Sequence, residues 1–187
     1  MMVPMNRLLL ITNAAAGTAD ERAIGEALEV LRQGAEVEVV ATRDEAELVT
    51  ALAERPGVPV VVAGGDGSLH ALVGALDGLG RLRRPGGDEG EAPVVGLLPL
   101  GTGNDFSRAL DLPRDPGAAA AVVLGGCTEP IDVVRDDTGG LVVNATIVYD
   151  NAGTALGAAF QVNDTRVGQQ HSAAVAVHSD GTFVVVW

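Results

Sequence analysis

The chain has 187 residues and a formal net charge of -13, so most of its surface would repel nucleic acids and anionic membranes. Hydrophobic residues make up 47% of the chain and aromatic residues only 3%, so its core must consist mainly of Val, Leu, Ile and Ala, as in parallel sheets covered by helices. All twelve basic residues are arginine, which excludes a Walker-type phosphate loop because that loop requires a lysine.

Two features of the sequence bear on the cellular compartment. Cys127 is the single cysteine, so the chain forms no internal disulfide and no cysteine-based zinc site, as is usual in a reducing environment. The apolar run at residues 8–12 is too short for a signal-peptide core or a membrane span. We therefore expect a soluble, cytoplasmic protein that binds no nucleic acid and contacts membranes at most peripherally. The sequence leaves its oligomeric state open.

The first part of the chain alternates short apolar runs with amphipathic segments. The predicted strands of this part cover residues 8–12, 36–39 and 58–63. Thr18 with Glu21, and Thr42 with Glu45, have the spacing of capping boxes and predict a helix after each threonine. The repeated order of strand, loop and helix predicts an α/β fold, a Rossmann-like parallel sheet with helices on both faces.

Two glycine-rich loops each follow a strand and precede a helix. The first is Gly-Gly-Asp-Gly-Ser at residues 64–68, and the second is Pro-Leu-Gly-Thr-Gly-Asn-Asp at residues 99–105. The adjoining elements are expected at residues 58–63, 69–76, 94–98 and 106–110, with a further helix at 116–124. Neither loop fits the dinucleotide pattern G-x-G-x-x-G, because His70 and Phe106 stand where the third glycine is required.

The rest of the chain differs from the first part in composition and in predicted structure. Residues 131–135 and 141–148 flank a turn-forming stretch and predict a hairpin, the start of a β-rich segment. After Tyr149 the chain is rich in Gly and Ala, and the apolar strand expected near residues 183–187 has no evident partner. We expect a nucleotide-binding domain at residues 1–127, the beginning of an incomplete β-rich domain at 128–149, and an atypical tail at 150–187.

The two glycine loops are the part of the sequence that indicates a ligand-binding site. In a parallel α/β sheet, ligands bind beyond the carboxyl ends of the strands, where the N-H groups at helix N-termini attract phosphate. Asp66 stands in the first loop, and a carboxylate beside phosphate requires an intervening divalent cation or a hydroxyl or N-H partner. The structural alternative is that both loops are plain turns and that Asp66 or Ser68 caps the following helix.

The loops and their order resemble those of the diacylglycerol, sphingosine and ceramide kinase superfamily. Residues 60–70 are similar to its Gly-Gly-Asp-Gly-Thr signature, and residues 98–108 to its second strong motif. Residues 13–17 are close to its first loop, Asn-Pro-x-x-Gly, and the resemblance spans roughly residues 7–148. Ala71 stands where many members carry glutamate, which removes a polar group from the expected site.

This resemblance implies ATP and Mg²⁺ as cofactors and a lipid as the second substrate. The residues that would contact Mg-ATP are Asn13, Gly17, Thr42, Gly64, Gly65, Asp66, Gly67, Ser68, Gly101, Thr102, Gly103, Asn104 and Asp105. Asp66 would be the metal ligand. Members of the family usually continue into a β-rich domain that holds the lipid and supplies an acidic general base, so the catalytic residue is expected outside this chain.

Residues 160–187 resemble instead a β repeat of large secreted bacterial proteins, without the glycine-aspartate repeat that binds calcium. The leading hypothesis for the chain is transfer of the γ-phosphate of ATP to a lipid hydroxyl by an incomplete catalyst. The alternatives are a catalytically silent nucleotide-binding module or fragment and an NAD kinase-like enzyme. Which lipid would be phosphorylated, and whether the tail is a natural fusion, stay open.

Overall fold

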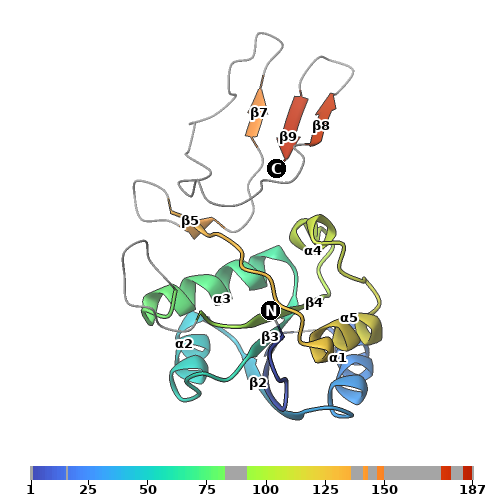
Figure 1. The fold of residues 1–187 in the computed structure, drawn as a ribbon, viewed down its shortest axis with the longest axis vertical. Coiled ribbons are helices and arrows are strands. Elements are labelled where there is room, and N and C mark those ends of the chain that lie inside the picture. The colour runs from blue at the N-terminus through green and yellow to red at the C-terminus, as the bar shows by residue number, and fades with distance from the viewer. Residues whose placement is uncertain are drawn as a thin grey trace. The chain divides into compact units, whose positions relative to one another are not determined.

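The computed structural model describes residues 2–15, 17–82, 92–135, 141–142, 147–149, 174–177 and 183–186. The chain divides into two compact units, Met1–Pro130 and Ile131–Trp187. The first unit contains a four-stranded parallel sheet with the strand order β2-β1-β3-β4 (Figure 1). Its strands are β1 (Arg7–Asn13), β2 (Glu36–Thr42), β3 (Val60–Gly64) and β4 (Val95–Pro99).

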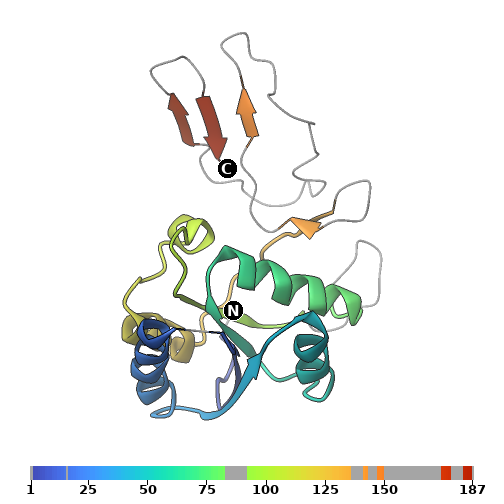
Figure 2. The ribbon, with the colours of Figure 1, turned by 180° about the vertical axis from the view of Figure 1, so that it is seen from behind.

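Helices cover both faces of this sheet, which confirms the predicted α/β architecture (Figures 1 and 2). On one face α1 (Thr18–Leu31) packs against α5 (Pro116–Gly125). On the other face α2 (Glu45–Ala53) packs against α3 (Asp66–Gly78). The five-residue helix α4 (Asp105–Ala109) lies between β4 and α5 in the chain.

The central strand β1 is apolar on both sides, and this explains its place in the sheet. Successive side chains of a strand point to opposite faces, so Leu8 and Leu10 point to one helix layer and Leu9 and Ile11 to the other. All four are buried, and Leu8 and Leu10 belong to one core cluster with residues of α1 and α5. Each such leucine stabilises the fold by about 1.5–3 kcal/mol.

The starts of α1 and α2 differ from the predicted capping boxes. Gly17 is the N-cap of α1 and provides no side-chain hydrogen bond, so Thr18 is the first helical residue rather than the cap. At α2 the cap is Asp44, which accepts a hydrogen bond from the Glu47 backbone N-H at 2.9 Å. The predicted cap Thr42 is instead the last residue of β2. A capping box is a short sequence pattern that does not show where the preceding strand ends. Here β2 extends through Thr42, the residue expected as the cap.

The second unit contains two small antiparallel sheets. β5 (Val134–Arg135) pairs with β6 (Leu141–Val142), at the place of the expected hairpin. Of the predicted strand at residues 141–148 the structure describes β6 and β7 (Ile147–Tyr149), which belong to different sheets, and residues 143–146 lie outside the described part of the chain. In that sheet β9 (Phe183–Val186) lies between β7 and β8 (Ala174–Val177).

The expectation that the final apolar strand has no partner is therefore wrong. β9 pairs along one edge with β7, which lies more than thirty residues earlier in the sequence. The pairing with β7 leaves no local pattern from which it could be predicted, whereas β8 directly precedes β9 among the elements and pairs with its other edge. The remaining residues of the proposed β repeat, 160–173, 178–182 and 187, lie outside the described part of the chain, as do residues 83–91 of the expected loop.

None of the helices within the described residues is long and apolar enough to cross a bilayer.

Candidate functional site

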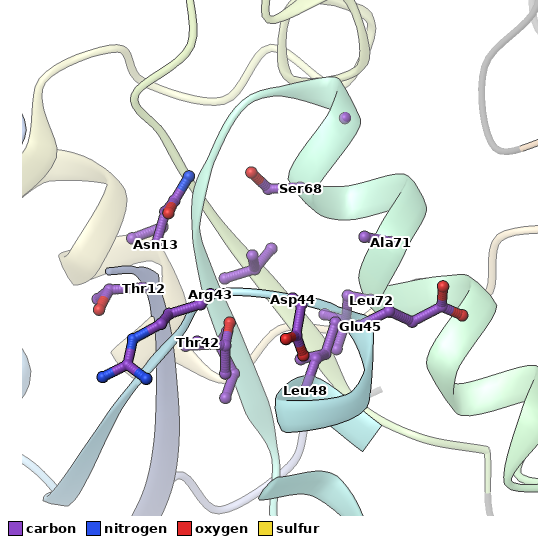
Figure 3. A pocket seen from close by; sticks show the side chains of 14 residues that line it. Thr12, Asn13, Thr42, Arg43, Asp44, Glu45, Leu48, Ser68, Ala71 and Leu72 are labelled. Atoms are coloured by element: carbon purple, nitrogen blue, oxygen red, sulfur yellow. The ribbon is translucent and has the colours of Figure 1, made fainter. Parts of the chain in front are cut away.

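A cavity of about 250 Å³ opens at the carboxyl ends of β1, β2 and β3 (Figure 3). The chain leaves β1 toward β2 on one side, and later returns to form β3 on the other side of β1. This reversal leaves a crevice at the strand ends, the position at which open α/β sheets bind ligands. The residues that line the cavity are Ile11, Thr12, Asn13, Thr42, Arg43, Asp44, Glu45, Leu48, Val62, Ala63, Gly67, Ser68, Ala71 and Leu72.

The lining combines an apolar wall with polar groups from three loops. Leu48 of α2 and Leu72 of α3 are buried beside the cavity. Asn13 and Thr42 bring an amide and a hydroxyl group to it from the ends of β1 and β2, and Ser68 brings a second hydroxyl from the first turn of α3 (Figure 3). An apolar wall with a few polar groups is typical of small-molecule sites. The volume is just below the range of about 300–1,000 Å³ usual for such sites, enough for part of a nucleotide.

The loop after β1 is held against the end of β2. The side chain of Asn13 accepts a hydrogen bond from the Ala15 backbone N-H at 2.8 Å. The Ala14 backbone N-H donates to the carbonyl of Thr42 at 3.0 Å. These two bonds place Asn13 and Thr42 side by side at the cavity.

The loop after β2 adds charged groups that were not among the predicted site residues. Arg43, Asp44 and Glu45 line the cavity, although Asp44 is already engaged as the cap of α2. The Glu47 carboxylate accepts from the Arg43 backbone N-H at 2.9 Å and forms an exposed ion pair with its guanidinium at 3.4 Å. Their position directly after β2 could have indicated them as site residues, because the carboxyl ends of parallel strands share one edge of the sheet.

The first glycine loop forms the turn from β3 into α3. Gly65 is the N-cap of α3, and that helix has no side-chain cap, so neither Asp66 nor Ser68 takes the structural role considered for it. A Cβ at position 64 would collide with the Ser68 side chain, whereas a Cβ at position 67 would meet no atom of the described residues within 4 Å. Gly67 therefore leaves an open approach to the first turn of α3, beside the cavity that it helps to line.

The second glycine loop lies against the first one. A Cβ at Gly101 would stand 2.6 Å from the Cα of Gly65 and 2.8 Å from Oδ1 of Asn104. A Cβ at Gly65 would likewise stand 3.0 Å from the Cα of Gly101. Glycine is needed at both positions because the two backbones touch, since any side chain would separate them.

Hydrogen bonds from the buried Asn104 side chain stabilise the second loop. Its backbone adopts the left-handed conformation, with φ 53°, and the residue is 7% exposed. The amide donates hydrogen bonds to the carbonyls of Gly101 at 2.5 Å and Pro99 at 3.3 Å, while its Oδ1 atom has no hydrogen-bond partner among the described residues. The buried hydroxyl of Ser107 donates to the Asn104 carbonyl at 2.9 Å.

Asp66 joins the two loops. One of its carboxylate oxygens accepts from the Asp105 backbone N-H at 2.9 Å, and the other accepts from the Phe106 backbone N-H at 3.0 Å. These are the first two residues of α4, so Asp66 caps a helix that begins about forty residues after it. The side chain of Asp105 forms an ion pair with Arg108.

The expected Mg-ATP residues thus fall into two groups. Asn13, Thr42, Gly67 and Ser68 line the cavity. The residues that do not line it are Gly17, Gly64, Gly65, Asp66, Gly101, Thr102, Gly103, Asn104 and Asp105. Gly17 is the N-cap of α1. The other residues of this group belong to the two glycine loops, which contact each other.

Within the described residues, no group of three or more His, Cys, Asp or Glu side chains is arranged to hold a metal ion. Mg²⁺ in nucleotide sites commonly uses one or two carboxylates together with phosphate oxygens and water. Asp66 fits that role in part, because each of its oxygens retains a lone pair beyond the one that receives an α4 N-H group.

The family model of the diacylglycerol kinase catalytic domain matches residues 7–135. The chain belongs to this family. It is 36% identical over 140 residues to a "Probable lipid kinase YegS-like" of Xanthomonas campestris pv. campestris, covering 73% of this chain and 42% of that protein. A protein with the same description from Cronobacter sakazakii is 35% identical over 127 residues, covering 65% and 40%.

The fold has solved counterparts. A diacylglycerol kinase from Bacillus anthracis str. Sterne matches with a TM-score of 0.63 at 24% identity, over 80% of this chain and 50% of that one. The likeness shows a shared fold. This family member therefore spans about two-fifths to half of the length of the relatives that it matches.

Proposed function

We propose that the unit Met1–Pro130 is the nucleotide-binding part of an ATP-dependent lipid kinase. The observation that carries the proposal is the cavity at the reversal of the sheet, in a chain of the diacylglycerol kinase catalytic domain family. The nucleoside of ATP would occupy the cavity between α2 and α3. Its phosphates would extend toward the first turn of α3, where Gly67 leaves the backbone open and Ser68 presents a hydroxyl.

Within this proposal each residue acts by binding or orientation. Asn13 and Thr42 would contact the nucleotide from the ends of β1 and β2, and the Ser68 hydroxyl would contact a phosphate oxygen. Mg²⁺, when bound with ATP, would neutralise phosphate charge, and Asp66 would be its protein ligand. The loop of Gly101, Thr102, Gly103, Asn104 and Asp105 would support this arrangement from outside the cavity.

The second substrate would be a lipid hydroxyl, as the names of the relatives suggest. Phosphoryl transfer depends mainly on positioning and on charge stabilisation, and both require that the acceptor be held in place. Because the chain covers 42% of the Xanthomonas relative, the lipid-binding groups and the general base would belong to the part that this relative has in addition. The chain would then bind ATP and catalyse transfer poorly by itself.

Calorimetry with Mg-ATP, followed by assays of ATP turnover with a panel of lipid acceptors, tests the proposal. Binding of ATP with lipid-dependent turnover supports a kinase. Binding without turnover supports the alternative of a catalytically silent nucleotide-binding module. Turnover with NAD as the acceptor would favour the NAD kinase-like alternative, and absence of ATP binding would contradict the proposed function.

A further inference from the structure

Helix α4 depends on a residue that is distant in the sequence. The first N-H groups of any helix lack partners within the helix and need an external acceptor. The N-cap of α4, Asn104, cannot supply one, because its amide group is turned to the carbonyls of Pro99 and Gly101. The Asp66 carboxylate accepts these N-H groups instead, at 2.9 and 3.0 Å.

The geometry points to Asp66 as a positioning residue: its carboxylate fixes the second glycine loop through α4, and thereby holds the first loop in its binding conformation. This inference rests on the proposed nucleotide site. It adds a task to Asp66 that needs no metal ion.

The contact between the loops transmits this effect to the cavity. Gly65, the N-cap of α3, lies against the backbone of Gly101, and the Cβ position of Gly103 is 3.4 Å from the nearer carboxylate oxygen of Asp66. If α4 loses its cap, the second loop is released from Gly65. Gly67 and Ser68 follow Gly65 directly and form the wall of the cavity at α3. Their position therefore depends on the Asp66 bonds.

The charge of Asp66 suits both helices that it adjoins. It is the first residue of α3 and accepts from the first two residues of α4, so its negative charge lies at the positive ends of both helix dipoles. A neutral Asn at this position would retain one acceptor oxygen for one of the two N-H groups. We therefore expect a graded series in which Asp66→Asn lies between the unaltered chain and Asp66→Ala.

Two measurements on the full chain test the inference. The first is hydrogen exchange of the Asp105 and Phe106 backbone amides by NMR, which reports the cap directly. Asp66→Ala should speed their exchange by about tenfold or more, the factor that corresponds to one charge-assisted hydrogen bond. Asp66→Asn should have a smaller effect, and it decides the outcome if Asp66→Ala does not fold.

The second measurement is ATP affinity, in Mg²⁺ and in EDTA. A positioning role predicts that Asp66→Ala weakens binding by roughly tenfold in both conditions, because loop position does not require the metal. Asp115→Asn is the matched control, because Asp115 caps α5 by accepting from Ala118 N-H at 2.8 Å and lies outside the cavity lining. It should leave both affinities unchanged.

Each alternative result has a distinct meaning. A loss of affinity that occurs only in Mg²⁺, with unchanged amide exchange, overturns the inference and leaves Asp66 as a metal ligand within the proposed function. If the unaltered chain binds no ATP, the proposed function fails, and the exchange rates still decide whether Asp66 holds α4. Unchanged exchange in a folded Asp66→Ala variant overturns the inference in either case.

Discussion

At the scale of single residues, Gly65 and Gly101 are constrained by the contact between the two glycine loops. The resemblance implied that Gly65 contacts Mg-ATP. In the structure its Cβ position faces Gly101, so the requirement for glycine comes from the contact between the loops. Gly67, whose Cβ position is open, is better placed for the ligand role.

We predict that Gly101→Ala destabilises the protein and weakens binding of Mg-ATP. The new Cβ would come within 2.6 Å of Gly65 Cα and 2.8 Å of Asn104 Oδ1, and overpacking of this kind costs about 1–3 kcal/mol of the free energy of unfolding. Urea denaturation and calorimetry measure the two effects.

Gly74→Ala in α3 is the matched control, because a Cβ placed there would meet no atom within 4 Å in the part of the chain that the structure describes. It should raise the free energy of unfolding by roughly 0.5–1 kcal/mol, since alanine favours a helix interior over glycine. If Gly101→Ala behaves like Gly74→Ala, the close contact between the loops does not exist in solution.

At the scale of elements, the edge strand β2 and the end of α2 are joined by Arg55. Its guanidinium donates to Oε1 of Glu38 at 2.6 and 2.9 Å, and to the carbonyl of Ala51 at 2.8 Å. Arg7 adds a longer ion pair to Glu38 at 3.5 Å. The hydrogen bonds from Arg55 hold the pKa of the Glu38 carboxyl below its usual value.

Because the pKa of the Glu38 carboxyl is lowered in the folded protein, the effect of Glu38→Gln on stability should depend on pH. A lowered pKa in the folded state means that the ionised carboxylate stabilises the fold above its unfolded pKa of about 4.3, and that this stability is lost as the pH falls through the folded pKa. Glu38→Gln should therefore reduce stability at pH 7, and the difference from the unaltered chain should shrink below about pH 4.

Urea denaturation over a series of pH values measures this difference. Glu26→Gln is the control, because Glu26 forms an exposed i,i+4 pair with Arg22, and such pairs contribute little. A difference for Glu38→Gln that stays constant from pH 7 to pH 3 would show that ionisation of Glu38 does not stabilise the contact.

At the scale of the whole molecule, the first unit contains every part of the candidate site. Its sheet, its cavity and both glycine loops lie within Met1–Pro130. A boundary near Tyr149, which the change in composition suggested, would cut between β7 and its partner β9. A boundary at Pro130 leaves no strand without its partner among the described residues.

We predict that a chain ending at Pro130 folds and keeps the ATP affinity of the full chain, because its core and cavity are complete. A chain ending at Tyr149 should bind equally well but aggregate more, since β7 would then present unpaired edges. Circular dichroism, calorimetry and light scattering compare the two. Loss of ATP binding in the shorter chain alone would show that residues after Pro130 contribute to the site.

The local sequence determined the order of the elements and the family of the chain. Apolar runs such as that of β1 and the helical pattern that follows it are short-range features, and the two glycine loops are contiguous motifs. Each could be recognised without knowing what lies next to it in space, which is why the parallel α/β architecture was predictable.

The tertiary structure decided which groups that are distant in the sequence contact each other. The bonds from Asp66 to α4, the contact of Gly65 with Gly101, and the pairing of β7 with β9 all join segments more than thirty residues apart. No short pattern encodes such partners, because a backbone N-H group or a glycine Cα carries no residue-specific signal. The sequence therefore identified Asp66 as a special residue, whereas the fold showed that its carboxylate caps α4.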